Sequence, residues 1–212
     1  MNKITTICLS LAASFGLSTS LFAHTKNDAG EVKHSTEIAA VQSDFTIGNG
    51  TFLLNGKPFV VKAAELHYPR IPRPYWEQRI QLCKALGMNT VCLYVFWNVH
   101  EEQPGVFNFE GQNDLAEFCR LCQKNGMYVI LRPGPYVCAE WEMGGLPWWL
   151  LKKKDIQLRT NDSYFLERVS IFEKEVGKQV KDLTIQNGGP IIMVLVSYTH
   201  LRAHETGRNL VC

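Results

Sequence analysis

Strand and helix patterns alternate along the chain from residue 44 onward, and this alternation constrains the fold more than any other feature. Short runs of apolar, β-branched or aromatic residues predict buried strands over 59–64, 89–96, 127–131 and 191–196. Apolar positions at helical spacing predict helices over 75–86, 113–124 and 162–183. Before this alternating part, the turn dipeptides Asn49-Gly50 and Asn55-Gly56 predict a hairpin over 45–58. Alternating strands and helices imply a parallel sheet with right-handed crossovers, either a doubly wound sheet or a (β/α)8 barrel.

Polar and aromatic residues favour the barrel, because they gather directly after three of the expected strands. They are Glu65 and His67 after the first strand, Trp97, Asn98, His100 and Glu101 after the second, and Glu140 and Trp141 after the third. Active sites of barrels are built at this C-terminal face of the sheet. No glycine-rich phosphate motif follows the first strand, which argues against a nucleotide-binding doubly wound sheet. We therefore expect an α/β fold, a (β/α)8 TIM barrel, of which this chain supplies about the first four strand–helix units.

The segment 132–149 is unusual in composition and follows the third expected strand. It reads Arg-Pro-Gly-Pro-Tyr-Val-Cys-Ala-Glu-Trp-Glu-Met-Gly-Gly-Leu-Pro-Trp-Trp. Prolines and glycines fix an irregular backbone, and four aromatic residues are expected to surround the carboxylate of Glu140: Tyr136, Trp141, Trp148 and Trp149. This composition suits the binding of a sugar ring. The alternative is a well-packed aromatic loop without a ligand.

This segment resembles the loop after the third barrel strand of glycoside hydrolase family 35, the β-galactosidase family. A second block, Leu93-Tyr-Val-Phe-Trp-Asn-Val-His-Glu101, is similar to the family's Tyr-x-x-Trp-Asn-x-His-Glu stretch, although Glu102 stands where the family usually has proline. The similarity runs from about Thr51 to Val194. The resemblance implies a retaining exo-acting enzyme that removes terminal β-linked galactose from an oligosaccharide or glycan, without a metal or organic cofactor.

The resemblance also assigns roles to individual residues. Positions that contact galactose in the family are matched by Tyr94, Cys138, Ala139 and Glu140. Glu140 is expected to accept hydrogen bonds from ring hydroxyls, with a buried, ion-paired carboxylate as the alternative. A supporting role at the floor of the site, or a purely structural one, is expected for Trp97, Asn98, His100, Glu101 and Trp141. Trp141 and Trp148 are expected to be sugar platforms or core residues.

No catalytic carboxylate is expected in this chain. The family's acid/base Glu lies just past the fourth strand in a Gln-Val-Glu-Asn-Glu-Tyr-Gly context, and its nucleophile lies near the seventh strand. After Met193 and Val194 the chain instead reads Leu-Val-Ser-Tyr-Thr-His, and residues 195–212 are interpreted as a non-native tail. His200, His204 and Glu205 in this tail are not interpreted as a metal site.

The N-terminal residues predict export. Residues 1–23 combine Lys3 with an apolar, small-residue run, which is typical of a secretory signal peptide. A retained membrane anchor is the alternative, which the short run disfavours. Residues 24–43 are polar and predict a flexible leader, so that 44–194 form the N-terminal half of the barrel. A periplasmic or extracellular location follows, with no membrane association after signal cleavage.

Composition excludes other functions. The net charge is +2, and the sequence lacks a basic cluster interleaved with aromatic residues, which argues against a nucleic-acid partner. Cysteines at apolar positions predict buried free thiols rather than disulfides or metal ligands: Cys83, Cys92, Cys119 and Cys122. Three functions stay open: a β-galactosidase-like hydrolase, a sugar-binding barrel without catalysis, and a non-functional fragment. Four strand–helix units fall short of the roughly 250 residues of a complete barrel, so we expect no hydrolysis by this chain alone.

Overall fold

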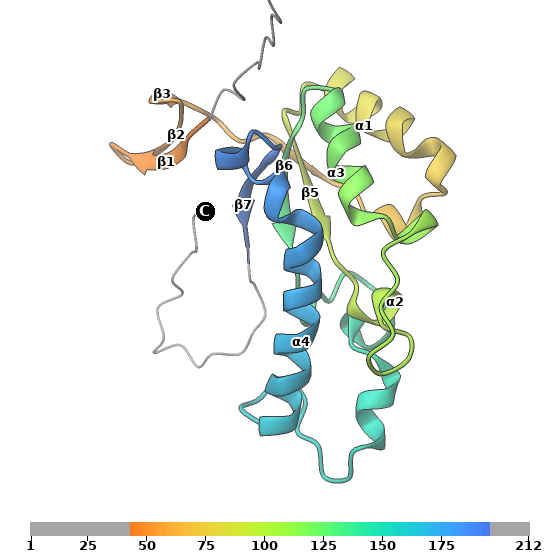
Figure 1. The fold of residues 1–212 in the computed structure, drawn as a ribbon. Coiled ribbons are helices and arrows are strands. Elements are labelled where there is room, and N and C mark those ends of the chain that lie inside the picture. Colours follow the sequence, from red (N-terminus) through yellow and green to blue (C-terminus); the bar gives the residue numbers. More distant parts are fainter. Residues whose placement is uncertain (1–42, 196–212) are drawn as a thin grey trace, which may run out of the picture. The chain divides into compact units, whose positions relative to one another are not determined.

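A computed structural model describes residues 43–195 of the chain (Figure 1). The predicted signal peptide (1–23), the leader (24–43) and the tail (195–212) lie outside these residues, apart from Ser43 and Leu195. Strands are β1 (Phe45–Gly48), β2 (Thr51–Leu54), β3 (Lys57–Pro58), β4 (Ala63–Glu65), β5 (Thr90–Tyr94), β6 (Tyr128–Arg132) and β7 (Ile191–Val194). Helices are α1 (Trp76–Ala85), α2 (Trp97–His100), α3 (Leu115–Lys124) and α4 (Ser163–Val180). Within the described residues, no helix is both long enough and apolar enough to span a bilayer.

The strands form two sheets. The predicted hairpin is present as the antiparallel sheet β1-β2-β3. The second sheet is parallel and has the order β4-β5-β6-β7, which is the order of the strands along the chain. A nucleotide-binding doubly wound sheet reverses its strand order at a switch point, whereas consecutive barrel strands do not. The predicted parallel α/β sheet is confirmed, and its strand order agrees with a run of barrel strands.

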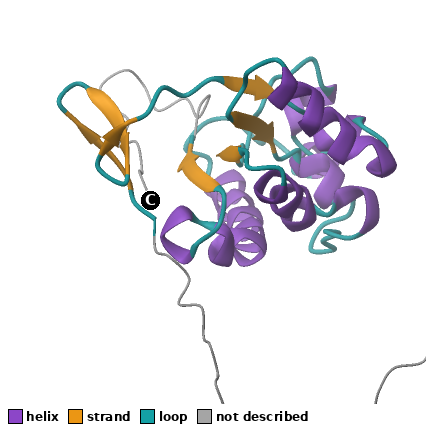
Figure 2. Cartoon of the chain, turned by 90° about the horizontal axis from the view of Figure 1, so that it is seen from above, coloured by secondary structure: helices purple, strands orange, loops and turns teal. Residues whose placement is uncertain are grey.

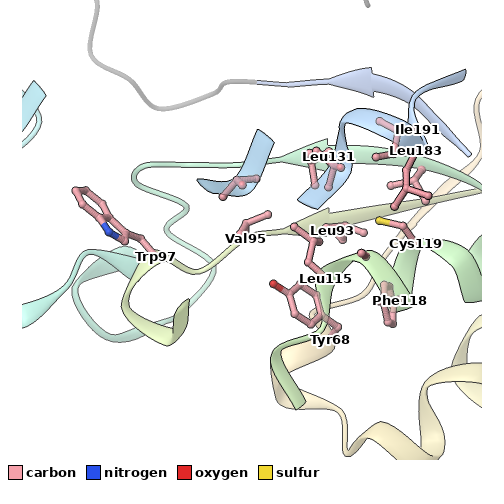
Figure 3. Packing of buried hydrophobic residues seen from close by; sticks show 14 of the residues in the cluster. Tyr68, Leu93, Val95, Trp97, Leu115, Phe118, Cys119, Leu131, Leu183 and Ile191 are labelled. Atoms are coloured by element: carbon pink, nitrogen blue, oxygen red, sulfur yellow. The ribbon is translucent and has the colours of Figure 1, made fainter. Parts of the chain in front are cut away.

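Helices cover one face of the parallel sheet, as Figure 2 shows. The main hydrophobic cluster joins α1, α3 and α4 to alternate residues of β5, such as Val91 and Leu93 (Figure 3). The intervening residue Cys92 faces the other side of the sheet and belongs to a second cluster with Phe45 of the hairpin and Ile192 of β7. This sorting follows from the two-residue side-chain period of a strand. It places Tyr94, two residues beyond Cys92, away from the helices.

Sequence patterns located most elements to within two residues, but the prediction of a buried strand over 59–64 is wrong. The strand β4 begins only at Ala63, and the side chains of Ala63 and Glu65 are exposed. Val60 is 69% exposed. The physical reason is that β4 pairs only with β5 among the described strands and so lies at an edge of the sheet. The helices α3 and α4 begin within two residues of the predicted starts, and Asp114 and Asp162 accept backbone N–H bonds as their N-caps.

The cysteine prediction is confirmed within the described residues. Cys92, Cys119 and Cys122 are buried and Cys83 is half-buried, and all four are free thiols. Burial raises the pKa of Cys119 to about 12, so this thiol stays neutral. The part of the chain that the structure describes also contains no group of three histidine, cysteine or acidic residues able to hold a metal ion.

A buried carboxylate ties the end of α2 to α4. Glu101 is fully buried and accepts hydrogen bonds from Trp97 Nε1 at 2.6 Å and the Gly105 backbone N–H at 2.7 Å. Its Oε1 also accepts from Arg168 Nη2 of α4 at 2.6 Å. The backbone carbonyl of the same residue accepts from Trp149 Nε1. Glu101 therefore links segments that are far apart in the sequence.

We expect Glu101→Ala to lower the free energy of unfolding by about 3 to 5 kcal/mol, because it leaves the partly buried Arg168 without its carboxylate. Urea unfolding followed by tryptophan fluorescence measures this difference. Glu117→Ala is the matched control, since Glu117 forms a more exposed pair with Arg120 on α3 and its loss should cost no more than about 1 kcal/mol. Equal losses in the two variants would contradict a structural role for Glu101.

Candidate active site

Three polar residues meet where adjacent parallel strands end. Glu65 ends β4, Tyr94 ends β5 and Arg132 ends β6, and the β5–β6 register pairs Tyr94 directly with Arg132. The Tyr94 hydroxyl donates to Glu65 Oε1 at 2.9 Å and accepts a hydrogen bond from Arg132 Nη1. The guanidinium of Arg132 also lies 3.5 Å from Glu65 Oε1 and 4.2 Å from the centre of the Tyr94 ring. These contacts fix the phenol at the C-terminal face of the sheet.

Burial, together with the hydrogen bond to Glu65, raises the pKa of Tyr94 to about 12. The phenol is therefore protonated at neutral pH and acts as a hydrogen-bond donor. Glu65 itself is partly exposed, with 55% of its side-chain surface accessible. The strand ends therefore present a solvent-accessible carboxylate beside a phenol whose proton is donated to it.

His67 lies beside Tyr94 and is neutral. Its ring packs edge-on against Tyr94 and Phe96, with centroid distances of 4.9 and 5.5 Å. Burial first, and then the nearby charge of Arg70, lowers the pKa of His67. Its Nδ1 lies 3.2 Å from Arg70 Nη1, a donor, which assigns the ring proton to Nε2. Nε2 is buried and has no hydrogen-bond partner among the described residues, so it offers an unused donor beside Tyr94.

An arch of left-handed backbone carries the predicted galactose contacts. Cys138, Ala139 and Glu140 have φ values of +62°, +53° and +47°. Non-glycine residues pay roughly 1–2 kcal/mol each for this conformation. Such strain persists only where the surroundings fix it, and it is frequent at binding sites. We refer to residues 138–140 as the arch.

Arg70 binds the arch, although the two follow different strands: Arg70 follows β4 and the arch follows β6, with β5 between these strands in the sheet. Its Nη2 donates to the carbonyl oxygens of both Ala139 and Glu140 at 2.7 Å. Its guanidinium also lies 4.8 Å from the centre of the Trp141 ring. The arch is closed further by the Trp141 backbone N–H, which donates to the Cys138 carbonyl at 3.0 Å. One arginine thus satisfies two carbonyls that the left-handed turn leaves outside regular structure.

The structure leaves Glu140 accessible. Its side chain is exposed, and it takes part in none of the ion pairs between described residues, so the alternative of a buried, ion-paired carboxylate is wrong. The negative charge of Glu140 tends to raise the pKa of His67, but burial and Arg70 have the larger, opposite effect. Cys138 is exposed and Ala139 is half-buried. The arch therefore presents Glu140 near the residues at the strand ends.

The residues expected at the floor of the site are mostly in the core instead. Trp97, His100 and Glu101 are fully buried. The Trp97 ring stacks on Phe172 of α4 at 5.1 Å, under the helices. The one-turn helix α2 causes this difference, because it turns these side chains away from the strand ends. Asn98 differs from these three residues because it binds the residue next to the arch: its Oδ1 accepts from Trp141 Nε1 at 3.0 Å.

The aromatic residues of segment 132–149 do not surround Glu140 as expected. Trp149 is buried against Trp97, and Tyr136 lies under the guanidinium of Arg159 at 3.8 Å. Trp141 is half-buried and packs on Phe96 at 4.4 Å, and Trp148 is 52% exposed. Short 3-10 turns at 142–145 and 148–152 point the side chains in different directions. Only Trp141 is adjacent to the arch.

His100 makes two buried hydrogen bonds. Its Nδ1 donates to the Asn108 carbonyl at 2.8 Å, and its Nε2 accepts from the Tyr68 hydroxyl. Burial lowers the pKa of His100 to about 4. His100 is thus a neutral structural residue, which agrees with the structural alternative given by the sequence.

The sequence analysis does not predict Arg70 or Arg132 at the site, and it gives His67 no role beyond its place after the first strand. Arg70 belongs to the irregular segment between β4 and α1, where no periodicity marks which side chains point to the sheet. A positively charged residue at or directly after the end of an expected strand could have indicated the site, since active sites of barrels are built at these strand ends. Arg132, the last residue of β6, meets that criterion.

A parallel α/β sheet that carries a group of polar side chains at its C-terminal edge is typical of the active-site face of α/β-barrel enzymes. Sequence comparison then identifies the family: residues 51–205 match glycosyl hydrolases family 35, and the chain belongs to that family. It is 49% identical over 145 residues to a β-galactosidase from Xanthomonas manihotis, covering 68% of this chain and 24% of that protein. A β-galactosidase from Bos taurus is 44% identical over 175 residues, covering 82% and 26%. The chain spans about a quarter of the length of these relatives.

Solved structures support the fold. An exo-β-1,4-mannosidase, Op5Man5 from Opitutaceae bacterium strain TAV5, matches with a TM-score of 0.54 at 19% identity. The match covers 66% of this chain and 25% of the mannosidase. A GH5_18 protein variant from Streptomyces cattleya, in complex with Manb1-4GlcNAc, matches with a TM-score of 0.51 at 14% identity, covering 65% and 33%. Both are TIM-barrel glycoside hydrolases. At this low sequence identity, the matches support only the similarity of the fold.

We expect Arg70→Gln to loosen the arch, because it removes charge-assisted hydrogen bonds to two carbonyls. Hydrogen exchange of the backbone amides of Val137, Trp141 and Gly144 should become about tenfold faster or more. Arg73→Gln is the matched control, since Arg73 binds the Gly111 carbonyl and Asp114 instead. Equal exchange at these amides in both variants would show that Arg70 does not hold the arch.

Protonation of His100 should reduce stability at acidic pH. Its pKa is about 4 in the folded protein and about 6.5 when unfolded, so the unfolded state binds the proton first and stability falls as pH falls below about 6.5. His67, whose pKa is also lowered, acts in the same direction. The free energy of unfolding from urea titrations should drop by about 2 kcal/mol from His100 between about pH 7 and pH 5. A His100 ring that titrates near pH 6.5 by NMR would contradict this.

Proposed function

We propose that the chain is the N-terminal part of the catalytic barrel of a retaining exo-β-galactosidase, and that it binds the terminal galactose of a β-galactoside. The observation that carries this proposal is the exposed carboxylate of Glu140 on a fixed arch beside Tyr94 and His67. The family membership and the β-galactosidase relatives support the substrate class. The parallel strand order supports a barrel, with β4 to β7 as its first four strands.

The arrangement matches the chemistry of a sugar ring. Glu140 accepts hydrogen bonds from ring hydroxyls, and the unpaired His67 Nε2–H supplies a donor. The Tyr94 hydroxyl donates its one proton to Glu65 and offers only its oxygen to a ligand. Cys138 and Ala139 place backbone and small side chains next to the ring, where larger groups would obstruct it. Interactions of this kind help catalysis when they are stronger in the transition state than in the ground state.

Proton transfer and nucleophilic attack are assigned to residues that this chain does not provide. Retaining glycosidases use two carboxyl groups roughly 5 to 5.5 Å apart. Where the acid/base segment of family 35 is expected, the chain reads Leu195-Val-Ser-Tyr. Glu65 is exposed, but both Tyr94 and Arg132 bind it, which suits a binding role. We therefore propose that this chain binds galactosides and does not hydrolyse them.

The proposal also includes export. The signal-like residues 1–23 support secretion to the periplasm or the extracellular space, where β-galactosides from glycans would be met. The polar residues 24–43 would then link the cleavage site to the barrel domain that begins near residue 44. Mass spectrometry of the mature N-terminus of the exported protein tests this part.

We expect Glu140→Gln to weaken the binding of methyl β-D-galactoside by about 10- to 100-fold, since charge-assisted hydrogen bonds are lost. NMR titration of the 212-residue chain measures the dissociation constant. Glu110→Gln is the matched control, because Glu110 is exposed and its side chain forms no hydrogen bond or ion pair with the described residues. Unchanged binding in Glu140→Gln would remove Glu140 from the site, and turnover of a chromogenic β-galactoside by purified wild-type chain would contradict the lack of catalysis.

A further inference from the structure

Trp148 differs from the other four tryptophans of the chain. The indole N–H groups of Trp76, Trp97, Trp141 and Trp149 all donate to oxygens of the protein. The structure gives the Trp148 N–H no acceptor among the described residues, and this side chain is 52% exposed. The Lys152 ammonium lies 4.6 Å from the centre of its ring. The indole therefore offers a ligand both an N–H donor and part of a flat apolar face.

The indole lines a cavity of about 380 Å³. Two carboxylates and two amides converge on the same cavity: Glu102, Gln103, Glu142 and Asn98. Leu146 supplies a further apolar wall. The lining comes from the segments after β5 and after β6, which also carry Tyr94 and the arch. We call this space the Trp148 cavity.

The chemistry of the lining fits a pyranose ring. One flat aromatic face matches the C–H face of such a ring, and planar carboxylates and amides match pairs of neighbouring hydroxyls. The Asn98 amide is oriented by its Oδ1, which accepts from Trp141 Nε1, so its NH₂ group is left to donate. Ligand sites typically combine apolar walls with a few placed polar groups in this way.

The position of the cavity relative to Glu140 follows from the backbone. Glu140 and the cavity residue Glu142 are two residues apart, so their Cα atoms lie within about 7.6 Å of each other. Trp141 stands between them and contacts both sides: it closes the arch and binds Asn98 of the cavity. A two-ring sugar is long enough to reach from Glu140 across Trp141.

We propose that the Trp148 cavity is a subsite for the second pyranose of a β-galactoside, the ring to which the terminal galactose is attached. The inference rests on the proposed function for the galactose ring, and it extends that function by assigning the preference for a two-ring substrate to Trp148. The Trp148 N–H and the amide of Asn98 donate to hydroxyls of the second ring, while Glu102 and Glu142 accept from them.

NMR of the ¹⁵N-labelled 212-residue chain tests this inference through the five indole N–H signals. Trp148→Ala identifies the Trp148 signal by its loss. Leu151→Ala is the matched control, since Leu151 is 58% exposed, belongs to the same turn as Trp148 and does not line the cavity. The probes are methyl β-D-galactoside with one ring, lactose with two, and methyl β-D-glucoside as a ring without galactose.

We expect lactose to shift the Trp148 signal and to bind the wild type about fivefold more tightly than Trp148→Ala. Methyl β-D-galactoside should bind both proteins equally, and Leu151→Ala should behave as the wild type. Lactose binding without a Trp148 shift, or an equal loss of both galactosides in Trp148→Ala, overturns the inference and leaves the proposed function standing. If neither galactoside binds, the proposed function fails; a Trp148 shift with methyl β-D-glucoside then still supports a pyranose site in the cavity, and its absence overturns that site too.

Discussion

β5 lies between two parallel neighbours, and its two-residue side-chain period sorts its residues between the core and the site. Leu93 and Val95 pack under the helices, whereas Tyr94 and Phe96 face the opposite side and form a separate cluster with Val137. A slip of one residue in the β5 register would exchange these two sets. Tyr94 would then leave its partners at the neighbouring strand ends. The geometry of the site thus depends on the same packing that stabilises the sheet.

The arch adds a second constraint, because its conformation is costly in isolation. Three consecutive left-handed residues persist when the fold binds their carbonyls and packs the residues that follow. Arg70 binds two of those carbonyls, and Gly144 lets the loop close, since a Cβ there would lie 2.0 Å from the ring of Tyr136. Arg70 follows β4 while the arch follows β6. The loop therefore acquires its shape only when the sheet has aligned both strands.

Much of the fold was predictable, because it depends on local patterns. Strand and helix periods located β5, β6, β7 and the main helices. The exposed Glu140 was predictable from its motif, while the direction of each neighbouring aromatic side chain was not. Those directions are set by short 3-10 turns and by contacts such as that of Arg159 with Tyr136, which join distant parts of the chain. A local sequence pattern does not indicate which distant residue a side chain will contact.

Two glutamates show how tertiary partners decide the role of a residue. Glu101 and Glu140 both follow a strand of the same sheet, and both are surrounded by aromatic residues in the sequence. Glu101 is fully buried because Arg168, 67 residues further along, neutralises it from α4. Glu140 is exposed, and Arg70 binds its backbone carbonyl rather than its carboxylate, which forms no ion pair within the described structure. An arginine that binds a glutamate side chain, as Arg168 binds Glu101, lets that carboxylate be part of the core. An arginine that binds only the backbone, as Arg70 does at Glu140, leaves the carboxylate available to a ligand.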